Sequence, residues 1–376
     1  MGLIVQDFKI MRTPRSVDVD ITNNCNLRCK YCSHFSGPGD VKQDLQKEEW
    51  LSFFNELNEC GVMDVVLAGG EPFIRDDLKE LISGIINNKM RFSILSNGTL
   101  ITDHTAQFIY ETGRCNGVQV SIDGACSETH DVFRGDGSFE KAIHGINCLK
   151  QHNVPVDVRV TVHKYNVNEL EDIAKLLLVD LELEGFSTNA ASFLGLCREN
   201  EENVQLSVED RSLAMEKLLK LNRHYDDRIS ASAGPLAEAR MWIKMQQARI
   251  ENKDSLPGGG FLTACGCVNV RIGVRADGVI VPCPMLSHIE LGRIGKDSLK
   301  DIWQNHPKMI EMRARAQIPL TDFDFCRGCD YIPYCTGNCT GLSYTRTGME
   351  HQPSPDECLK RFLEEGGKLP VRSCEI

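Results

Sequence analysis

The sequence predicts an α/β protein in which a parallel sheet is followed by a smaller, cysteine-rich region. Short apolar runs alternate with amphipathic helical patterns as far as about residue 190, which indicates right-handed βαβ units. After about residue 205 the pattern becomes helical, and beyond a Pro/Gly-rich stretch at 254–261 the chain becomes rich in cysteine. We therefore expect the main domain boundary in that stretch.

Each element of the first region is predicted from a local pattern. VDVDIT at 17–22 alternates apolar and polar residues as a strand does, whereas KEEWLSFFNELNECG at 47–61 repeats its apolar residues with a helical period and ends on a glycine. On the same grounds, further strands are predicted at 63–69, 91–96, 117–123, 156–162 and 183–191, and further helices at 76–89, 103–113, 139–152 and 168–180. These units fit either a partial barrel or a doubly wound sheet, and the pattern alone does not choose between them.

The second half of the chain follows a different pattern. VEDRSLAMEKLLKLNRHYDD and PLAEARMWIKMQQARIENK predict two helices with no strand between them. VNVRIGVRADGVIVPC then predicts a hairpin that turns at 276–278. In a reducing cytosol the 17 cysteines are not expected to form disulfides, and their clustering favours metal or iron–sulfur ligation.

Composition excludes several function classes. No apolar run is long enough to cross a membrane, and the apolar stretch at the N-terminus is too short for a signal peptide, so we expect a cytoplasmic protein without a membrane partner. The net charge of −11 argues against nucleic acid as a partner, because binding to phosphates requires a basic surface.

Three cysteines stand close together after the first predicted strand. Cys25, Cys29 and Cys32 have the spacing C-x3-C-x2-C. Three protein ligands leave one metal position open for a cofactor or substrate, and a loop after a strand is where such folds place their active sites. The alternative is a zinc site completed by a distant ligand such as His34.

The loop, with Tyr31 just before its last cysteine, resembles the signature of the radical S-adenosylmethionine (radical SAM) enzymes. The resemblance implies that the three cysteines hold a [4Fe–4S] cluster whose open iron is chelated by S-adenosylmethionine. It further implies that reductive cleavage of this cofactor gives methionine and a 5′-deoxyadenosyl radical, which abstracts a hydrogen atom from the substrate.

Further motifs match that family at the ends of the next predicted strands. AGGEP at 68–72 matches its GGE motif and suits the methionine amine, since carbonyl and carboxylate oxygens accept from an ammonium group. Ser121 in VSIDG is expected to bond the ribose, and the planar fork of Arg134 in HDVFRG suits the methionine carboxylate. The cofactor-binding residues implied by the resemblance are Gly69, Gly70, Glu71, Ser96, Asn97, Ser121, Asp123 and Arg134.

The C-terminal cysteines resemble the SPASM domain, an extension of radical SAM enzymes that binds two auxiliary iron–sulfur clusters; a zinc ribbon is the alternative. The resemblance implies one cluster on Cys265, Cys267, Cys283 and Cys339, and another on Cys326, Cys329, Cys335 and Cys358. Because Cys265 and Cys267 are only one residue apart, either both bind one cluster or one leaves an iron open to substrate.

Together the resemblances imply a partial (β/α)6 radical SAM barrel followed by the SPASM domain, with S-adenosylmethionine and three [4Fe–4S] clusters as cofactors. The expected divisions are an N-terminal extension at 1–16, the barrel at 17–205, a helical bridge and linker at 206–260, the SPASM domain at 261–366 and a tail at 367–376. No acid or base is singled out, and Cys126 and Cys197 are candidate catalytic residues because they follow the fourth and sixth strands.

Members with this domain mostly modify ribosomally made peptides, so the resemblance implies a peptide maturase, with crosslink formation as the expected reaction. The implied partners are a peptide substrate and a flavodoxin- or ferredoxin-type reductant. Leader recognition, where the substrate needs it, is expected from a separate leader-binding protein or from the barrel surface. Two alternatives remain: a radical SAM dehydrogenase or epimerase acting on a small molecule such as an amino sugar, and a non-catalytic iron–sulfur electron carrier.

Overall fold

One curved sheet organises the molecule. The structure is a computed structural model that describes residues 11–35, 43–263 and 266–370. Its ten strands follow the order β10-β9-β8-β1-β2-β3-β4-β5-β6-β7. The strands are β1 (Ser16–Thr22), β2 (Asp64–Gly69), β3 (Arg91–Ser96), β4 (Cys115–Ser121), β5 (Val156–Val162), β6 (Phe186–Ala190), β7 (Ile229–Ala231), β8 (Arg271–Val274), β9 (Val279–Val281) and β10 (Gly292–Arg293). Neighbours from β1 to β7 pair in parallel, as the alternation of strands and helices predicts.

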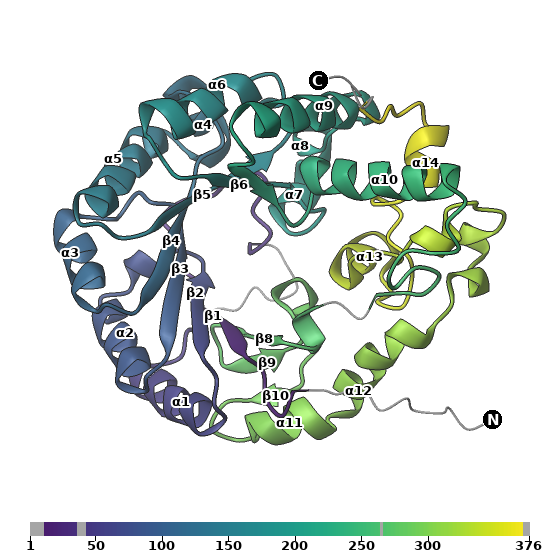
Figure 1. Ribbon diagram of the computed structural model, residues 1–376. Helices are drawn as coiled ribbons and strands as arrows, with labels where there is room; N and C mark the ends of the chain where they lie inside the picture. Colours follow the sequence, from purple (N-terminus) through teal and green to yellow (C-terminus); the bar gives the residue numbers. More distant parts are fainter. Residues whose placement is uncertain (1–10, 36–42, 264–265, 371–376) are drawn as a thin grey trace.

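Helices cover the outside of this sheet, and the chain closes into a ring around a central space (Figure 1). No helix within the described ranges is long and apolar enough to cross a lipid bilayer. The helices are α1 (Lys47–Glu59), α2 (Leu78–Asn87), α3 (Asp103–Glu111), α4 (Ser127–Arg134), α5 (Ser138–Gln151), α6 (Leu170–Lys175) with a π-helical turn (Leu176–Asp180), α7 (Leu196–Glu199), α8 (Glu201–Val204), α9 (Val208–His224), α10 (Pro235–Ile250), α11 (Leu299–Asn305), α12 (Pro307–Ala314), α13 (Thr340–Thr347) and α14 (Leu359–Glu364).

Strand β1 shows how the sequence separates the core from the central space. Val17, Val19 and Ile21 are fully buried in the main apolar cluster, which includes side chains of the outer helices. Because successive side chains of a strand point to opposite faces, Asp18 and Asp20 lie on the other face and line a central cavity. The barrel therefore has an apolar outer layer and a polar interior.

The C-terminal region extends the same sheet. β8 pairs in parallel with β1, and β8 and β9 form the predicted antiparallel hairpin. Asp277 stabilises the hairpin turn, because its carboxylate accepts from the backbone N–H of Val279 at 3.3 Å and from the Arg275 Nη2 at 2.6 Å.

The six predicted strands of the first region are confirmed, and the curvature of the sheet resolves the choice in favour of the partial barrel. The expectation of no strand between the two helices after residue 205 is wrong. β7 lies between α9 and α10 and pairs with β6. Its three residues, Ile229–Ala231, are too few to show a period of two, so they carry no strand pattern. The pattern also missed α4, which ends at Arg134.

Candidate functional site

The cysteine loop leaves the carboxyl end of β1 and borders a cavity of about 260 Å³, called here the loop cavity. Cys25, Cys29 and Cys32 all line it. Burial raises the pKa of the Cys29 thiol to about 11, and the neighbouring Cys25 and Cys32 add to the rise. The Cys25 sulfur accepts a hydrogen bond from the Leu27 N–H at 3.4 Å, a contact of the kind that stabilises a thiolate bound to iron.

The two glycines of AGGEP hold the start of this loop. The Gly70 N–H donates to the Thr22 carbonyl at 2.8 Å, and the Glu71 N–H donates to the Asn24 carbonyl at 2.8 Å. A Cβ on Gly70 would lie 2.1 Å from the Asn24 oxygen, and one on Gly69 would lie 2.3 Å from the Thr22 oxygen. Glycine is therefore required because two backbone segments approach each other too closely for a side chain.

Glu71 is buried behind the loop cavity and links β2 to β3. Its carboxylate accepts from the Ser96 hydroxyl at 2.9 Å, the Asn97 N–H at 2.7 Å and the Phe73 N–H at 3.1 Å. Burial raises the pKa of Glu71 to about 7 even though these donors act in the opposite direction. The structure thus gives Glu71 a positioning role, and its expected bond to an ammonium group stays a prediction.

Arg134 reaches the loop cavity from the last residue of α4 and pairs with a buried carboxylate. Its Nε donates to Asp123 at 2.5 Å, and Asp123 also accepts from the Thr161 N–H at 2.7 Å and from the Tyr31 hydroxyl. Burial raises the pKa of Asp123, but the charge and hydrogen bond of Arg134 together with His163 and His130 outweigh burial, and the pKa lies below its usual range. The pair fixes the guanidinium in one orientation at the cavity wall.

The structure brings most of the predicted cofactor-binding residues together. The loop cavity is lined by the three cysteines and by Gly69, Gly70, Ser96, Asn97, Ser121 and Arg134, whereas Glu71 and Asp123 lie behind its wall. The two candidate catalytic cysteines are not among the lining residues. Cys126 is exposed, and Cys197 is buried in a small apolar cluster with Tyr31 and Phe133. The geometry therefore gives neither of them a role at the cavity.

Four C-terminal cysteines surround a second, small cavity. Cys326, Cys329, Cys335 and Cys358 line about 30 Å³ of space. Burial raises the pKa of Cys326 to about 12, and the other three cysteines each add to the rise. The sulfur of Cys335 accepts from the Gly337 N–H at 3.4 Å and that of Cys358 from the Arg361 N–H at 3.5 Å. This is the set predicted from the sequence for one auxiliary cluster.

The other predicted set is described only in part. Cys283 precedes a 3₁₀ turn (Pro284–Leu286), and Cys339 directly precedes α13. The two elements pack together, since Met285 meets Gly341 and the rings of His288 and Tyr344 stack at 3.8 Å. Both cysteines therefore stand at the starts of neighbouring helical turns. Cys267 lies in another 3₁₀ turn (Gly266–Val268), and Cys265 falls outside the described residues.

The cysteines fit clusters better than single ions. Within the described residues, no group of three or more His, Cys, Asp or Glu side chains has the geometry to hold one metal ion. An iron–sulfur cubane offers a separate iron to each thiolate, so its ligands stand around a cavity instead of converging on one point. The donor arrangement at both cavities thus argues against the zinc alternatives.

A third cavity, called here the lumen chamber, occupies the inside of the barrel with a volume of about 740 Å³. It adjoins the loop cavity, because Ser33, Gly69, Leu95 and Asn189 line both. Sequence reasoning missed its charged residues, which are Asp18, Asp20, Asp157, Arg159, Arg271 and Arg275. The available signal was the alternation in VDVDIT and VDVRVTV, which places charged residues on the strand face opposite the valines.

Comparison with known families agrees with this geometry. A model of the radical SAM superfamily matches residues 19–177, and a model of the SPASM iron–sulfur cluster-binding domain matches residues 265–330. The chain belongs to the radical SAM superfamily and carries a SPASM domain. It is therefore an enzyme of the class that uses S-adenosylmethionine and iron–sulfur clusters.

Individual relatives of this radical SAM protein differ in what they act on. The AdoMet-dependent heme synthase of Methanosarcina barkeri is 29% identical over 348 residues, which cover 90% of this chain and 95% of the relative. The PqqA peptide cyclase of Granulibacter bethesdensis is 24% identical over 343 residues, which cover 89% of this chain and 84% of the relative. The structure of Streptococcus suis SuiB bound to its precursor peptide SuiA has a TM-score of 0.71 at 14% identity, covering 93% and 77%, and shows the shared fold.

Proposed function

We propose that this radical SAM enzyme oxidatively modifies a ribosomally made peptide held in the lumen chamber, with formation of a crosslink as the reaction. When bound at Cys25, Cys29 and Cys32, the reduced cluster and S-adenosylmethionine supply the radical that abstracts a substrate hydrogen atom. We further propose that the two C-terminal cysteine sets hold auxiliary clusters, giving three clusters in all, and that a flavodoxin- or ferredoxin-type protein supplies electrons.

The observation that carries this proposal is the position and lining of the lumen chamber. It opens onto the loop cavity, so a substrate in it lies beside the place where the cofactor is expected. Among the described residues, its wall is formed by charged, amide and hydroxyl side chains together with aliphatic ones, and none of these residues is Phe, Tyr or Trp. Such a wall can satisfy the donors and acceptors of a peptide backbone.

The side chains of this protein have defined tasks in that scheme. Arg134, fixed by Asp123, is placed to bind the carboxylate of the methionine moiety. Ser121 lines the same cavity and is placed to bond the ribose.

A second candidate is oxidation of a small molecule, favoured by the heme synthase relative that covers nearly the whole chain. The lumen chamber argues against a flat macrocycle as substrate, because its described lining residues include no Phe, Tyr or Trp on which a large apolar ring could stack. The peptide proposal is therefore preferred to this one.

Co-expression with a candidate short peptide, followed by mass spectrometry, tests the proposal. A loss of two hydrogens from the peptide supports crosslinking or dehydrogenation, whereas an otherwise unchanged composition with one deuterium taken up from heavy water indicates epimerisation. A Cys25→Ala variant should abolish both the mass change and 5′-deoxyadenosine formation, while Cys60→Ala, at the end of α1, should preserve them. Formation of 5′-deoxyadenosine by Cys25→Ala at the wild-type rate would refute the proposal.

A further inference from the structure

The lumen chamber holds three arginines, and they differ in how they are paired. Arg271 lies 3.4 Å from Asp18, and Arg275 lies 2.6 Å from Asp277 and 3.2 Å from Glu290. Arg159 has no ion pair among the described residues, and its terminal nitrogens meet no hydrogen-bond partner there. One guanidinium of the chamber is thus available to a ligand.

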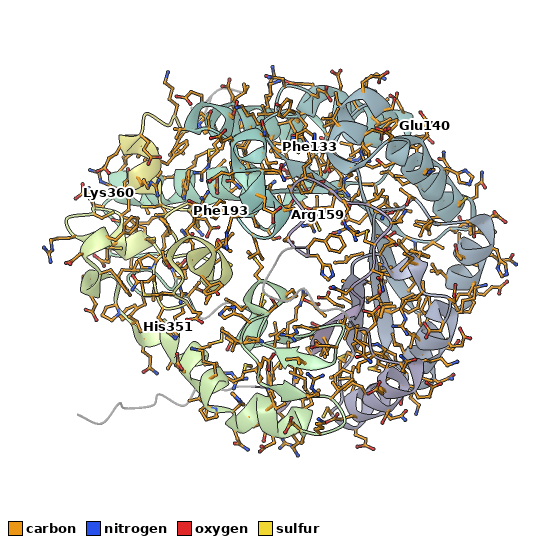
Figure 2. The ribbon with its side chains drawn as sticks, turned by 180° about the vertical axis from the view of Figure 1, so that it is seen from behind. Phe133, Glu140, Arg159, Phe193, His351 and Lys360 are labelled. Carbon is orange, nitrogen blue, oxygen red and sulfur yellow. The ribbon has the colours of Figure 1, made fainter. Side chains whose placement is uncertain are left out.

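Arg159 is nevertheless held in a fixed position. Its Nε donates to the Ser187 hydroxyl at 2.8 Å, and that hydroxyl donates to Asp157 at 3.1 Å. Ser187 is also the register partner of Arg159 across β5 and β6. A side chain anchored through Nε leaves the outer edge of its planar fork free, which is the edge that binds a carboxylate bidentately. Figure 2 shows Arg159 at the border of the central space.

Asp20 faces the same chamber from another part of the wall. Asp20 lies on β1, whereas Arg159 lies on β5. Three strands stand between these two in the curved sheet, so β1 and β5 lie on different sides of the central space (Figure 1). In the described part of the chain the Asp20 carboxylate makes no hydrogen bond or ion pair. Its pKa is raised to about 7 by burial and by the neighbouring Asp18.

We propose that the lumen chamber binds a carboxylate of the substrate at Arg159, while Asp20 accepts a hydrogen bond from a donor on the same substrate. This inference rests on the proposed function and specifies the chemistry of its substrate. The carboxylate comes either from an acidic side chain of a peptide or from a small organic acid, and the same site serves both.

The charge of the chamber selects a carboxylate over a phosphate. Three carboxylates, Asp18, Asp20 and Asp157, line the chamber together with the arginines. A phosphate with nearly two negative charges would be repelled by these groups more strongly than a carboxylate with one. One unpaired guanidinium therefore matches one singly charged group.

Binding of two matched pairs of probes to the anaerobically reconstituted protein tests the inference. The peptide pair is N-acetyl-Gly-Glu-Gly-amide and N-acetyl-Gly-Gln-Gly-amide, and the small-molecule pair is glutarate and glutaramide. Saturation-transfer NMR gives the dissociation constants for wild type, Arg159→Gln and Arg159→Lys. Arg114→Gln is the control, because Arg114 is exposed, donates to the Lys89 carbonyl and carries the same charge.

We expect an acidic probe to bind the wild type. Its affinity for Arg159→Gln should be at least about tenfold lower, because a bidentate charge-assisted pair is lost. Arg159→Lys should retain part of the affinity and Arg114→Gln all of it. Tighter binding of the acidic peptide assigns the carboxylate to a peptide, and tighter binding of glutarate assigns it to a small acid. Equal binding of acid and amide probes, or of wild type and Arg159→Gln, overturns the inference.

A second measurement needs no variant. Phenylglyoxal labels accessible guanidinium groups, and peptide mapping of the labelled wild type follows Arg159 and Arg114 separately. The acidic probe should slow labelling at Arg159 and not at Arg114; equal rates at Arg159 with and without the probe contradict the inference. Formation of 5′-deoxyadenosine by the wild type tests the proposed function on its own. If this product forms but no carboxylate binds, the inference alone fails.

Discussion

Replacing Asp20 by asparagine removes a charge from the polar interior of the barrel. Asp20 lies on β1 among lining residues of the lumen chamber and has no partner among the described residues. Burial and then the charge of Asp18 raise its pKa from 3.8 to about 7. The folded protein therefore holds this proton over a pH range in which the unfolded chain has lost it.

The sign and size of the effect follow from linkage. Because the pKa of Asp20 is higher in the folded state, its contribution to the free energy of unfolding is complete below about pH 4 and is lost as pH rises to about 7. The pKa of Asp20 rises by about 3, and each unit corresponds to about 1.4 kcal/mol. The contribution of Asp20 to the free energy of unfolding is therefore at most roughly 4 kcal/mol. Water in the chamber lowers this to about 2 kcal/mol. Asp20→Asn should thus be more stable than wild type at pH 8 by about this amount.

Urea unfolding under anaerobic conditions, measured from pH 5 to pH 8.5 for wild type and Asp20→Asn, provides the assay. The difference in free energy of unfolding between Asp20→Asn and wild type should grow from pH 5 to about pH 7 and level off above that. Asp76→Asn is the matched control, because Asp76 is exposed and makes the same change of charge. A difference between Asp20→Asn and wild type that stays constant with pH would refute the reasoning.

Three further predictions concern the cavities. Gly70→Ala should prevent assembly of the N-terminal cluster and lower iron content, since its Cβ would lie 2.1 Å from the Asn24 oxygen, whereas Gly117→Ala, with its nearest contact at 3.4 Å, should retain iron. Cys358→Ala should lower bound iron by up to about four atoms per chain in a ferrozine assay, while the cysteine loop at the loop cavity keeps its iron. Unchanged iron content would contradict the assignment of Cys358 to an auxiliary cluster. Arg134→Lys should weaken S-adenosylmethionine binding about tenfold in equilibrium dialysis, because lysine keeps the charge but loses the planar fork; equal affinity would contradict this.

The sequence predicted the barrel well because its strands and helices have strong periods. The alternation of valine and aspartate in 17–22 gave both the strand and, in principle, the face that meets the lumen chamber. The three-residue β7 and the helix α4 carried no comparable pattern, so both were missed. Pairing of β8 with β1 joins segments about 250 residues apart, and local periodicity contains no information on such a contact.

The candidate site was predicted unevenly for a related reason. Motif residues identified the wall of the loop cavity. They did not show that the Glu71 carboxylate accepts hydrogen bonds from Ser96 and Asn97, or that Gly70 is required because the Asn24 backbone lies so close to it. These roles depend on which backbone segments cross, and that is a tertiary fact. Arg159 was missed because its significance lies in terminal nitrogens that have no partner among the described residues, which only a structure can establish.

The shared sheet connects the C-terminal cysteines structurally to the cysteine loop. β1 leads directly into the loop that holds Cys25, and its other neighbour besides β2 is β8 of the C-terminal hairpin. In the chain, β9 of that hairpin is followed by Cys283. The next turn contacts the start of α13, because Met285 lies against Gly341. A substrate bound in the lumen chamber, as proposed, would therefore touch both regions at once, because Asp20 and Met285 line the same space. In the proposed scheme, auxiliary clusters held by the C-terminal cysteines would accept electrons from that substrate.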